Sequence, residues 1–143
     1  MNRAEALGLL RSLDLPHGDY AVFGSGPLLV SGIIDDAADL DVIARGAAWV
    51  HAQTTGAMVH LAEHGVTIAS FFDGAVTVGN RWAIGSFSVD SLIDSADVIE
   101  GLPFVDLDQV RAYKLIADRP KDRDHIRRLD LWKAADSFET DGH

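Results

Sequence analysis

Two aspartates separated by one residue, Asp39 and Asp41, are the first side chains whose types and spacing suit metal chemistry. Leu40, Val42 and Ile43 around them predict a buried strand, on which residues i and i+2 point to the same face. Two carboxylates on one face repel each other and lose hydration, and a divalent cation with oxygen ligands relieves both effects. The pair therefore indicates a metal site, with an acidic loop at the start of a strand as the alternative.

A third acid, Asp90, lies alone in the β-prone segment 87–93. We expect this segment to form a strand, on which a solvent-facing aspartate would be ordinary. If Asp90 points inward, it supplies a third carboxylate to the metal site. We therefore expect the carboxylates of Asp39, Asp41 and Asp90 to lie together on adjacent strands.

The segment Phe23-Gly24-Ser25-Gly26-Pro27 predicts a strand that ends in a glycine turn and leads into a helix, because proline suits the first helical turn. Such a turn exposes backbone N–H groups that bind phosphate, and we expect Gly24 and Ser25 to do so. It is not a dinucleotide fingerprint, because residue 29 is Leu29 rather than glycine, and no P-loop lysine follows. A tight turn without a ligand is the alternative.

Positive charge is concentrated near the end of the chain. The net charge is −10, which argues against non-specific binding to nucleic acid or anionic membranes, yet residues 111–133 hold eight of the twelve basic residues. Lys114 lies in an apolar stretch and Arg119 and Lys121 follow, so these three predict a phosphate site, with a solvated helix face as the alternative. The remaining cations are expected to pair on that helix with nearby acids, namely Arg123, Arg127, Arg128 and Lys133 with Asp122, Asp124 and Asp130.

Periodicity and turn residues predict one domain, residues 1–143, of the α/β (α+β) class, with a mixed sheet and flanking helices. Helices are expected over residues 2–13, 27–33, 47–64, 106–117 and 121–137, and strands over 20–23, 39–43, 66–72, 75–78 and 87–93. Asn2 and Glu5 form a capping-box pattern, and Asp73-Gly74 is a hairpin signal. The absence of cysteine, of a long apolar run and of a signal peptide predicts a cytoplasmic protein without membrane attachment.

Together these motifs resemble the DNA polymerase β-type nucleotidyltransferase superfamily. Gly24-Ser25, a short helix, Asp39-x-Asp41 and a later strand aspartate follow that superfamily's pattern. The segments 99–103 and 114–122, the latter containing Arg119-Pro120-Lys121-Asp122, resemble small bacterial nucleotidyltransferase-like proteins related to AbiEii-type toxins. The resemblance covers roughly residues 18–130. Relatives often carry an acid three residues after the Lys-Asp pair, where this chain has His125.

The resemblance implies a transferase that moves a nucleoside monophosphate from an NTP to an acceptor hydroxyl on RNA, protein or a small molecule. Gly24, Ser25 and Lys114, with Arg119 and Lys121, would hold the triphosphate. Asp39, Asp41 and Asp90 would hold two Mg²⁺ ions, which activate the hydroxyl and stabilise the leaving pyrophosphate.

The alternative is an inactive module of the same fold that binds a nucleotide or a cognate partner protein, as one component of a toxin–antitoxin pair. The small size of the chain and the departure at His125 favour this second interpretation.

Overall fold

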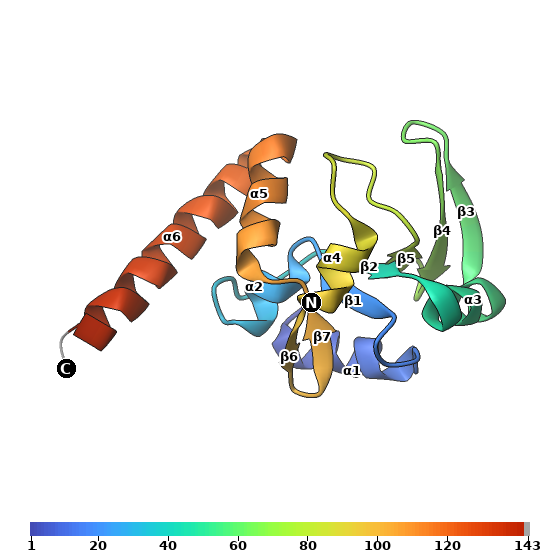
Figure 1. The fold of residues 1–143 in the computed structure, drawn as a ribbon, viewed down its shortest axis with the longest axis horizontal. Coiled ribbons are helices and arrows are strands. Elements are labelled where there is room, and N and C mark those ends of the chain that lie inside the picture. The colour runs from blue at the N-terminus through green and yellow to red at the C-terminus, as the bar shows by residue number, and fades with distance from the viewer. Residues whose placement is uncertain (142–143) are drawn as a thin grey trace.

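A computed structural model describes residues 1–141, and within them one mixed seven-stranded sheet is flanked by six helices (Figure 1). The expected α/β class with a mixed sheet is confirmed. The strands are β1 (Tyr20–Phe23), β2 (Leu40–Ala44), β3 (Ala57–Leu61), β4 (Val66–Phe71), β5 (Val76–Gly79), β6 (Asp97–Ile99) and β7 (Leu102–Phe104). The helices are α1 (Arg3–Ser12), α2 (Gly26–Val30), α3 (Gly46–Thr55), α4 (Val89–Asp94), α5 (Leu107–Ala117) and α6 (Pro120–Asp141).

The sheet has the strand order β3-β4-β5-β2-β1-β7-β6. β2 is parallel to β5 and β1 is parallel to β7, whereas the other neighbouring pairs are antiparallel. The central strands are buried along almost their whole length, and Asp41 is the one residue of β1 and β2 that is not. The centre of the sheet is therefore a rigid apolar base from which one carboxylate emerges.

Short-range signals placed several elements correctly. Asn2 and Glu5 form the expected reciprocal capping box at the start of α1. The turn at Asp73 and Gly74 has positive φ at both residues and joins the antiparallel strands β4 and β5. Asp106 caps α5 by accepting a hydrogen bond from the Gln109 N–H.

The expected helix over residues 47–64 is wrong in its second half. α3 ends at Thr55, and residues 57–61 form β3, which pairs with β4 along its whole length. Gly56 takes an extended conformation between the two elements, and a Cβ there would lie 2.7 Å from the Phe71 ring of β4. Pairing with β4 thus overrides the helical pattern, and Gly65, expected to end a helix, lies in the β3–β4 turn.

The expected strand over residues 87–93 is also wrong. Ser88 accepts a hydrogen bond from the Ser91 N–H and begins helix α4, which Asp90 joins in its first turn. A serine N-cap with an acid in the first turn is a helix-start signal that outweighs the β-prone residues here. Strands β6 and β7, which the sequence patterns did not predict, follow as a short hairpin turning at Glu100 and Gly101.

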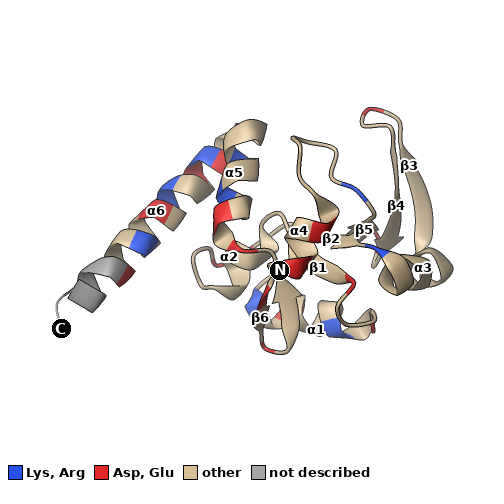
Figure 2. Cartoon of the chain, viewed as in Figure 1, with Lys and Arg blue, Asp and Glu red and all other residues tan. Residues whose placement is uncertain are grey.

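The last two helices lie side by side at the opposite end of the molecule from the β3–β4 hairpin (Figure 1). Asp118 adopts a left-handed conformation that ends α5, and Pro120 begins α6. Basic and acidic residues alternate along α6 (Figure 2). No helix in the part of the chain that the structure describes is both long and apolar enough to cross a membrane.

Candidate functional site

A cleft of about 260 Å³ opens where the sheet meets the last two helices. One part of its wall comes from the β1–α2 turn, the start of β2 and the α5–α6 corner. The other part comes from the β3–β4 hairpin, β5 and the loop after β5. Seven of the eight residues singled out from the sequence line it, namely Gly24, Ser25, Asp39, Asp41, Lys114, Arg119 and Lys121. Residues up to 97 positions apart in the sequence therefore share one cavity with acidic and basic walls.

Asp41 is the central acid of the cleft. It lies in register with Phe23 of β1 on one side and with Thr77 of β5 on the other. The Thr77 hydroxyl donates a 3.0 Å hydrogen bond to Asp41 Oδ1. Burial, reinforced by the negative charge of Asp39, nevertheless raises the pKa of Asp41 above its usual value. The site therefore disfavours two ionised carboxylates unless positive charge is supplied.

The turn at Gly24 approaches this acid closely. Gly24 has a φ of +63°, and a Cβ added to it would lie 2.8 Å from Asp41 Oδ2. Both the left-handed backbone and the contact with Asp41 require glycine at this position. The glycine turn and the acidic pair are thus parts of one site.

The helix after this turn differs from the expectation. α2 has only five residues, and its N-cap Ser25 makes no side-chain capping bond. A helix this short contributes little dipole, so an anion here would depend on side-chain groups. The Ser25 hydroxyl is one such group. It lies beside Lys114, whose Nζ donates a 3.3 Å hydrogen bond to Ser25 Oγ.

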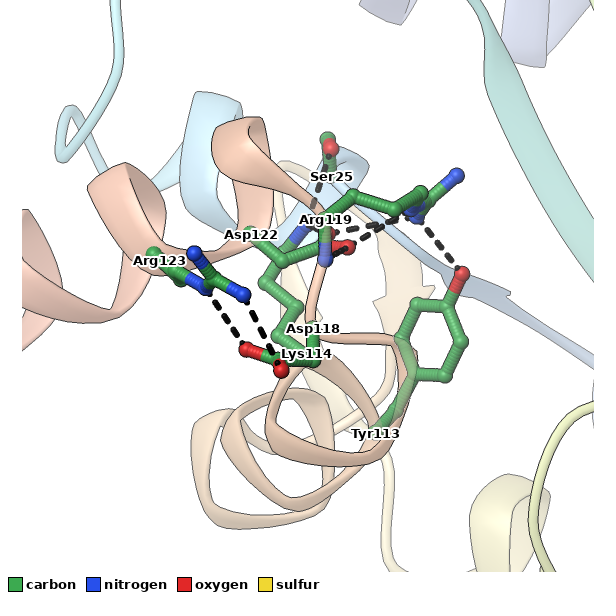
Figure 3. Close-up of polar contacts among 7 residues, drawn as sticks. All are labelled: Ser25, Tyr113, Lys114, Asp118, Arg119, Asp122 and Arg123. Atoms are coloured by element: carbon green, nitrogen blue, oxygen red, sulfur yellow. Dashed lines mark hydrogen bonds and ion pairs between the residues drawn. The ribbon is translucent and has the colours of Figure 1, made fainter.

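Lys114 is almost completely buried, with 1% of its side chain exposed, and its ammonium is paired with the fully buried Asp122 at 3.2 Å (Figure 3). Burial lowers the pKa of Lys114, which Asp122 partly offsets. Lys114 lines the wall of the cleft, and its ammonium donates to Asp122 and to the Ser25 hydroxyl.

Asp122 holds a second cation as well. Its Oδ2 accepts hydrogen bonds from Arg119 Nε at 2.6 Å and from the Arg119 N–H at 3.1 Å. Although burial opposes ionisation, the bonds from Arg119 and Lys114 lower the pKa of Asp122 to about 2. Arg119 in turn donates to Tyr113 Oη at 2.9 Å (Figure 3). One buried carboxylate therefore fixes the positions of two cleft cations.

This role of Asp122 corrects the expectation that it is a solvated partner of helix arginines. The surface pairs that do form are Arg111–Asp130, Arg123–Asp118, Arg127–Asp124, Arg128–Asp124 and Lys133–Asp108. The packing of α5 against α6 buries residue 122, which a helical charge pattern alone does not reveal.

Positive charge on the cleft wall favours the ionised form of Asp41. Lys121 and Arg119 both lower the pKa of Asp41, although burial and Asp39 together outweigh them. The cleft is thus lined by two carboxylates and four cationic side chains, yet the pKa of Asp41 stays above its usual value. That arrangement suits a ligand carrying both an anion and a bound metal ion.

Asp90 does not join this site. Instead of a strand position beside Asp41, it occupies α4, where 77% of its side chain is exposed. Arg45 Nη1 donates to Asp90 Oδ1 at 2.7 Å, and the same guanidinium also pairs with Asp94 and Asp19. The expected triad on adjacent strands is therefore wrong, because the helix carries Asp90 into an ion-pair cluster around Arg45.

The neighbouring strand presents Thr77, not an acid, beside Asp41. Among the described residues, no cluster of three or more histidine, cysteine, aspartate or glutamate side chains is placed to hold a metal ion. Magnesium, however, keeps several waters and often binds through one or two carboxylates plus substrate phosphates. Asp39 and Asp41 fit one such ion bound together with a phosphate, rather than a two-ion site built from protein ligands alone.

Several cleft residues were not assigned to the site from the sequence. Thr77 owes its place to the parallel register of β2 and β5, for which a single sequence carries no signal. Trp82, Tyr113, His64 and Arg81 also line the cleft. Trp82 lies four residues after the end of the expected strand over residues 75–78, in the loop that follows β5.

Comparisons of this chain with protein-family models, curated proteins and solved structures found no match.

Proposed function

We propose that this protein is a magnesium-dependent nucleotidyltransferase that transfers a nucleoside monophosphate from an NTP to an acceptor hydroxyl on RNA, protein or a small molecule. The observation that carries the proposal is the single cleft shared by Asp39, Asp41, Gly24, Lys114 and Arg119. A metal-bound triphosphate is the common ligand that suits adjacent acidic and cationic walls. The motif resemblance to the polymerase β-type superfamily supports the same activity.

The roles of the side chains follow from their surroundings. Asp39 and Asp41 would bind the ion, and the Thr77 hydroxyl would orient the Asp41 carboxylate through the bond to its Oδ1. When bound, Mg²⁺ would supply Lewis-acid stabilisation of phosphate charge. Lys114, Arg119 and Lys121 would neutralise the negative charge that develops on the phosphates during transfer.

The buried ion pair would preorganise these cations. Asp122 holds Lys114 Nζ and the Arg119 guanidinium before any ligand arrives, so less side-chain entropy is lost on binding. Because the pKa of Asp122 is about 2, its carboxylate would stay ionised throughout the physiological pH range. A nucleotide-dependent activity of this kind fits a cytoplasmic location, where NTP is available.

A second candidate function is nucleotide or partner binding without transfer, for example as one component of a toxin–antitoxin pair. It is favoured by the departure of Asp90 from the site and by Thr77 at the register position beside Asp41. His125 favours it as well, because burial lowers its pKa to about 4 and keeps the imidazole neutral at pH 7. A neutral imidazole carries no negative charge, so His125 does not replace the acid that relatives often carry at this position.

Transfer of label from an NTP labelled at the α-phosphate separates the two functions. The purified protein is incubated with Mg²⁺ and the labelled NTP in a cell extract that supplies RNA, proteins and small molecules as acceptors. We expect label on one acceptor class, loss of labelling in Asp41→Asn and retention in Asp35→Asn, an exposed acid outside the cleft. Nucleotide binding without labelling would instead support the inactive module, and absence of nucleotide binding would contradict the transferase and leave partner binding as the second candidate.

A further inference from the structure

The cleft has an apolar half beside its charged half. Leu61, Val66, Ile68, Trp82 and Ile84 contribute to its wall from β3, β4 and the loop after β5. The acids and the α5–α6 cations come from other elements. A ligand that fills the cleft therefore needs an anionic part joined to an apolar part.

Trp82 is the largest side chain of the apolar half, and aromatic neighbours hold its ring. The ring centroid lies 4.5 Å from that of Phe23 and 5.0 Å from that of Tyr113, with an edge-on angle of 87° to the tyrosine. Both neighbours are buried, whereas Trp82 is half-buried and lines the cleft. Its buried Nε1 has no hydrogen-bond partner among the described residues, so ring packing holds the side chain.

The tryptophan is also coupled to the cationic wall. Tyr113, which contacts its ring edge-on, precedes Lys114 in α5 and accepts a hydrogen bond from Arg119. Trp82 therefore packs against the same helix end that carries two cationic groups, Lys114 and Arg119. One ligand can reach both without spanning separate parts of the molecule.

We propose that the apolar half of the cleft binds the nucleobase and that Trp82 is the surface on which the base stacks. This inference rests on the proposed function, since it assumes that a nucleotide phosphate occupies the charged half. A base is planar, and stacking on an aromatic ring strengthens binding for any base because every base has a π face. Trp82 is then a binding residue for the base, separate from the residues that bind phosphate.

Calorimetry with two kinds of probe tests this assignment. The four NTPs carry a base, whereas inorganic tripolyphosphate carries only the phosphates, and each is titrated with Mg²⁺. We expect Trp82→Ala to weaken the tightest-binding NTP by about tenfold or more, the lower range for loss of one stacked base, and to leave tripolyphosphate affinity unchanged. Trp82→Phe retains a stacking ring and should lose less. Trp132→Ala, on α6 and outside the cleft, is the matched control.

Fluorescence gives a second measurement that does not depend on the stability of Trp82→Ala. In the Trp49→Phe/Trp132→Phe variant, Trp82 is the remaining tryptophan of the chain. NTP should quench its emission by stacking, and tripolyphosphate should not. If Trp82→Ala loses affinity for both probes, this quenching decides the question.

The outcomes separate the inference from the proposed function. Unchanged NTP affinity in Trp82→Ala, or NTP binding without quenching of Trp82, overturns the stacking role and leaves the proposed function standing. If neither NTP nor tripolyphosphate binds the wild-type protein, the proposed function fails and the stacking role fails with it.

Discussion

Lys114 Nζ and Asp122 Oδ1 lie 3.2 Å apart, and both side chains are almost fully excluded from solvent. Each charge is costly to bury alone, so the pair stabilises the fold only as a unit. The same pair fixes the corner between α5 and α6, from which Arg119 and Lys121 enter the cleft. Stability and ligand binding are therefore linked at this corner.

Removing one partner of this pair should destabilise the protein strongly. We expect Asp122→Asn to lower the free energy of unfolding by about 3 kcal/mol or more, because Lys114 is left as an uncompensated buried charge. The Lys114→Met/Asp122→Asn double variant should recover part of that loss, as urea titration would show. If the loss in the double variant equals the sum of the losses in Lys114→Met and Asp122→Asn, the two side chains do not interact energetically.

Acid should weaken the stabilisation that ionised Asp122 provides through its pair with Lys114. The pKa of Asp122 is about 2 in the folded protein, below the ordinary aspartate value of 3.8. A group whose pKa is lower in the folded state than in the unfolded state stabilises the fold. This stabilisation is complete above the unfolded-state pKa and disappears as the pH falls through the folded-state pKa. The difference in unfolding free energy between wild type and Asp122→Asn should therefore shrink from about pH 4 towards about pH 2. A difference independent of pH over that window would contradict ionisation of Asp122.

Lys114 should matter for nucleotide binding and Arg128 should not. Lys114→Met preserves most of the packed stem and removes the ammonium beside Ser25, so NTP affinity should fall by about tenfold or more. Arg128 pairs with Asp124 on the exposed face of α6 and lies outside the cleft. Calorimetric titration of Arg128→Ala should match wild type, and equal losses in the two variants would indicate a diffuse basic surface instead of a phosphate lysine.

Gly24 should be more sensitive to substitution than a glycine with similar backbone geometry elsewhere. Gly24→Ala forces a Cβ against Asp41 Oδ2, whereas a Cβ added to Gly32, at φ +77°, would meet no atom within 4 Å. Both alanines incur left-handed strain of about 1–2 kcal/mol. Only Gly24→Ala should also weaken Mg²⁺–NTP binding, measured by calorimetry. If Gly32→Ala weakens binding equally, strain and not contact with Asp41 is responsible.

Binding of Mg²⁺ should depend on pH through Asp41. Burial and Asp39 raise the pKa of Asp41, so protons compete with the metal at higher pH than for an ordinary carboxylate. Thr77→Val removes the hydrogen bond that favours ionised Asp41, and its Mg²⁺–NTP affinity should begin to fall at higher pH than in wild type. Thr67→Val, on the exposed face of β4, is the control. Superimposable profiles for Thr77→Val and wild type would exclude this coupling.

How much of this site a single sequence reveals depends on the range of the interactions involved. Neighbours within a few residues set the capping box at Asn2 and the turn at Asp73-Gly74, and the sequence predicted both. The sequence also identified most of the charged and glycine residues of the cleft, because the chemical properties of these side chains do not depend on where the fold places them.

Tertiary structure decided the rest through contacts between distant segments. Residues 57–61 became a strand because β4 supplies their hydrogen-bond partners, and Asp90 left the site because α4 directs it towards Arg45. Thr77 stands beside Asp41 through the parallel register of two strands, and Asp122 is buried because α5 packs on α6. Local propensity carries no information about these partners, since each arises only when the chain brings separate elements together.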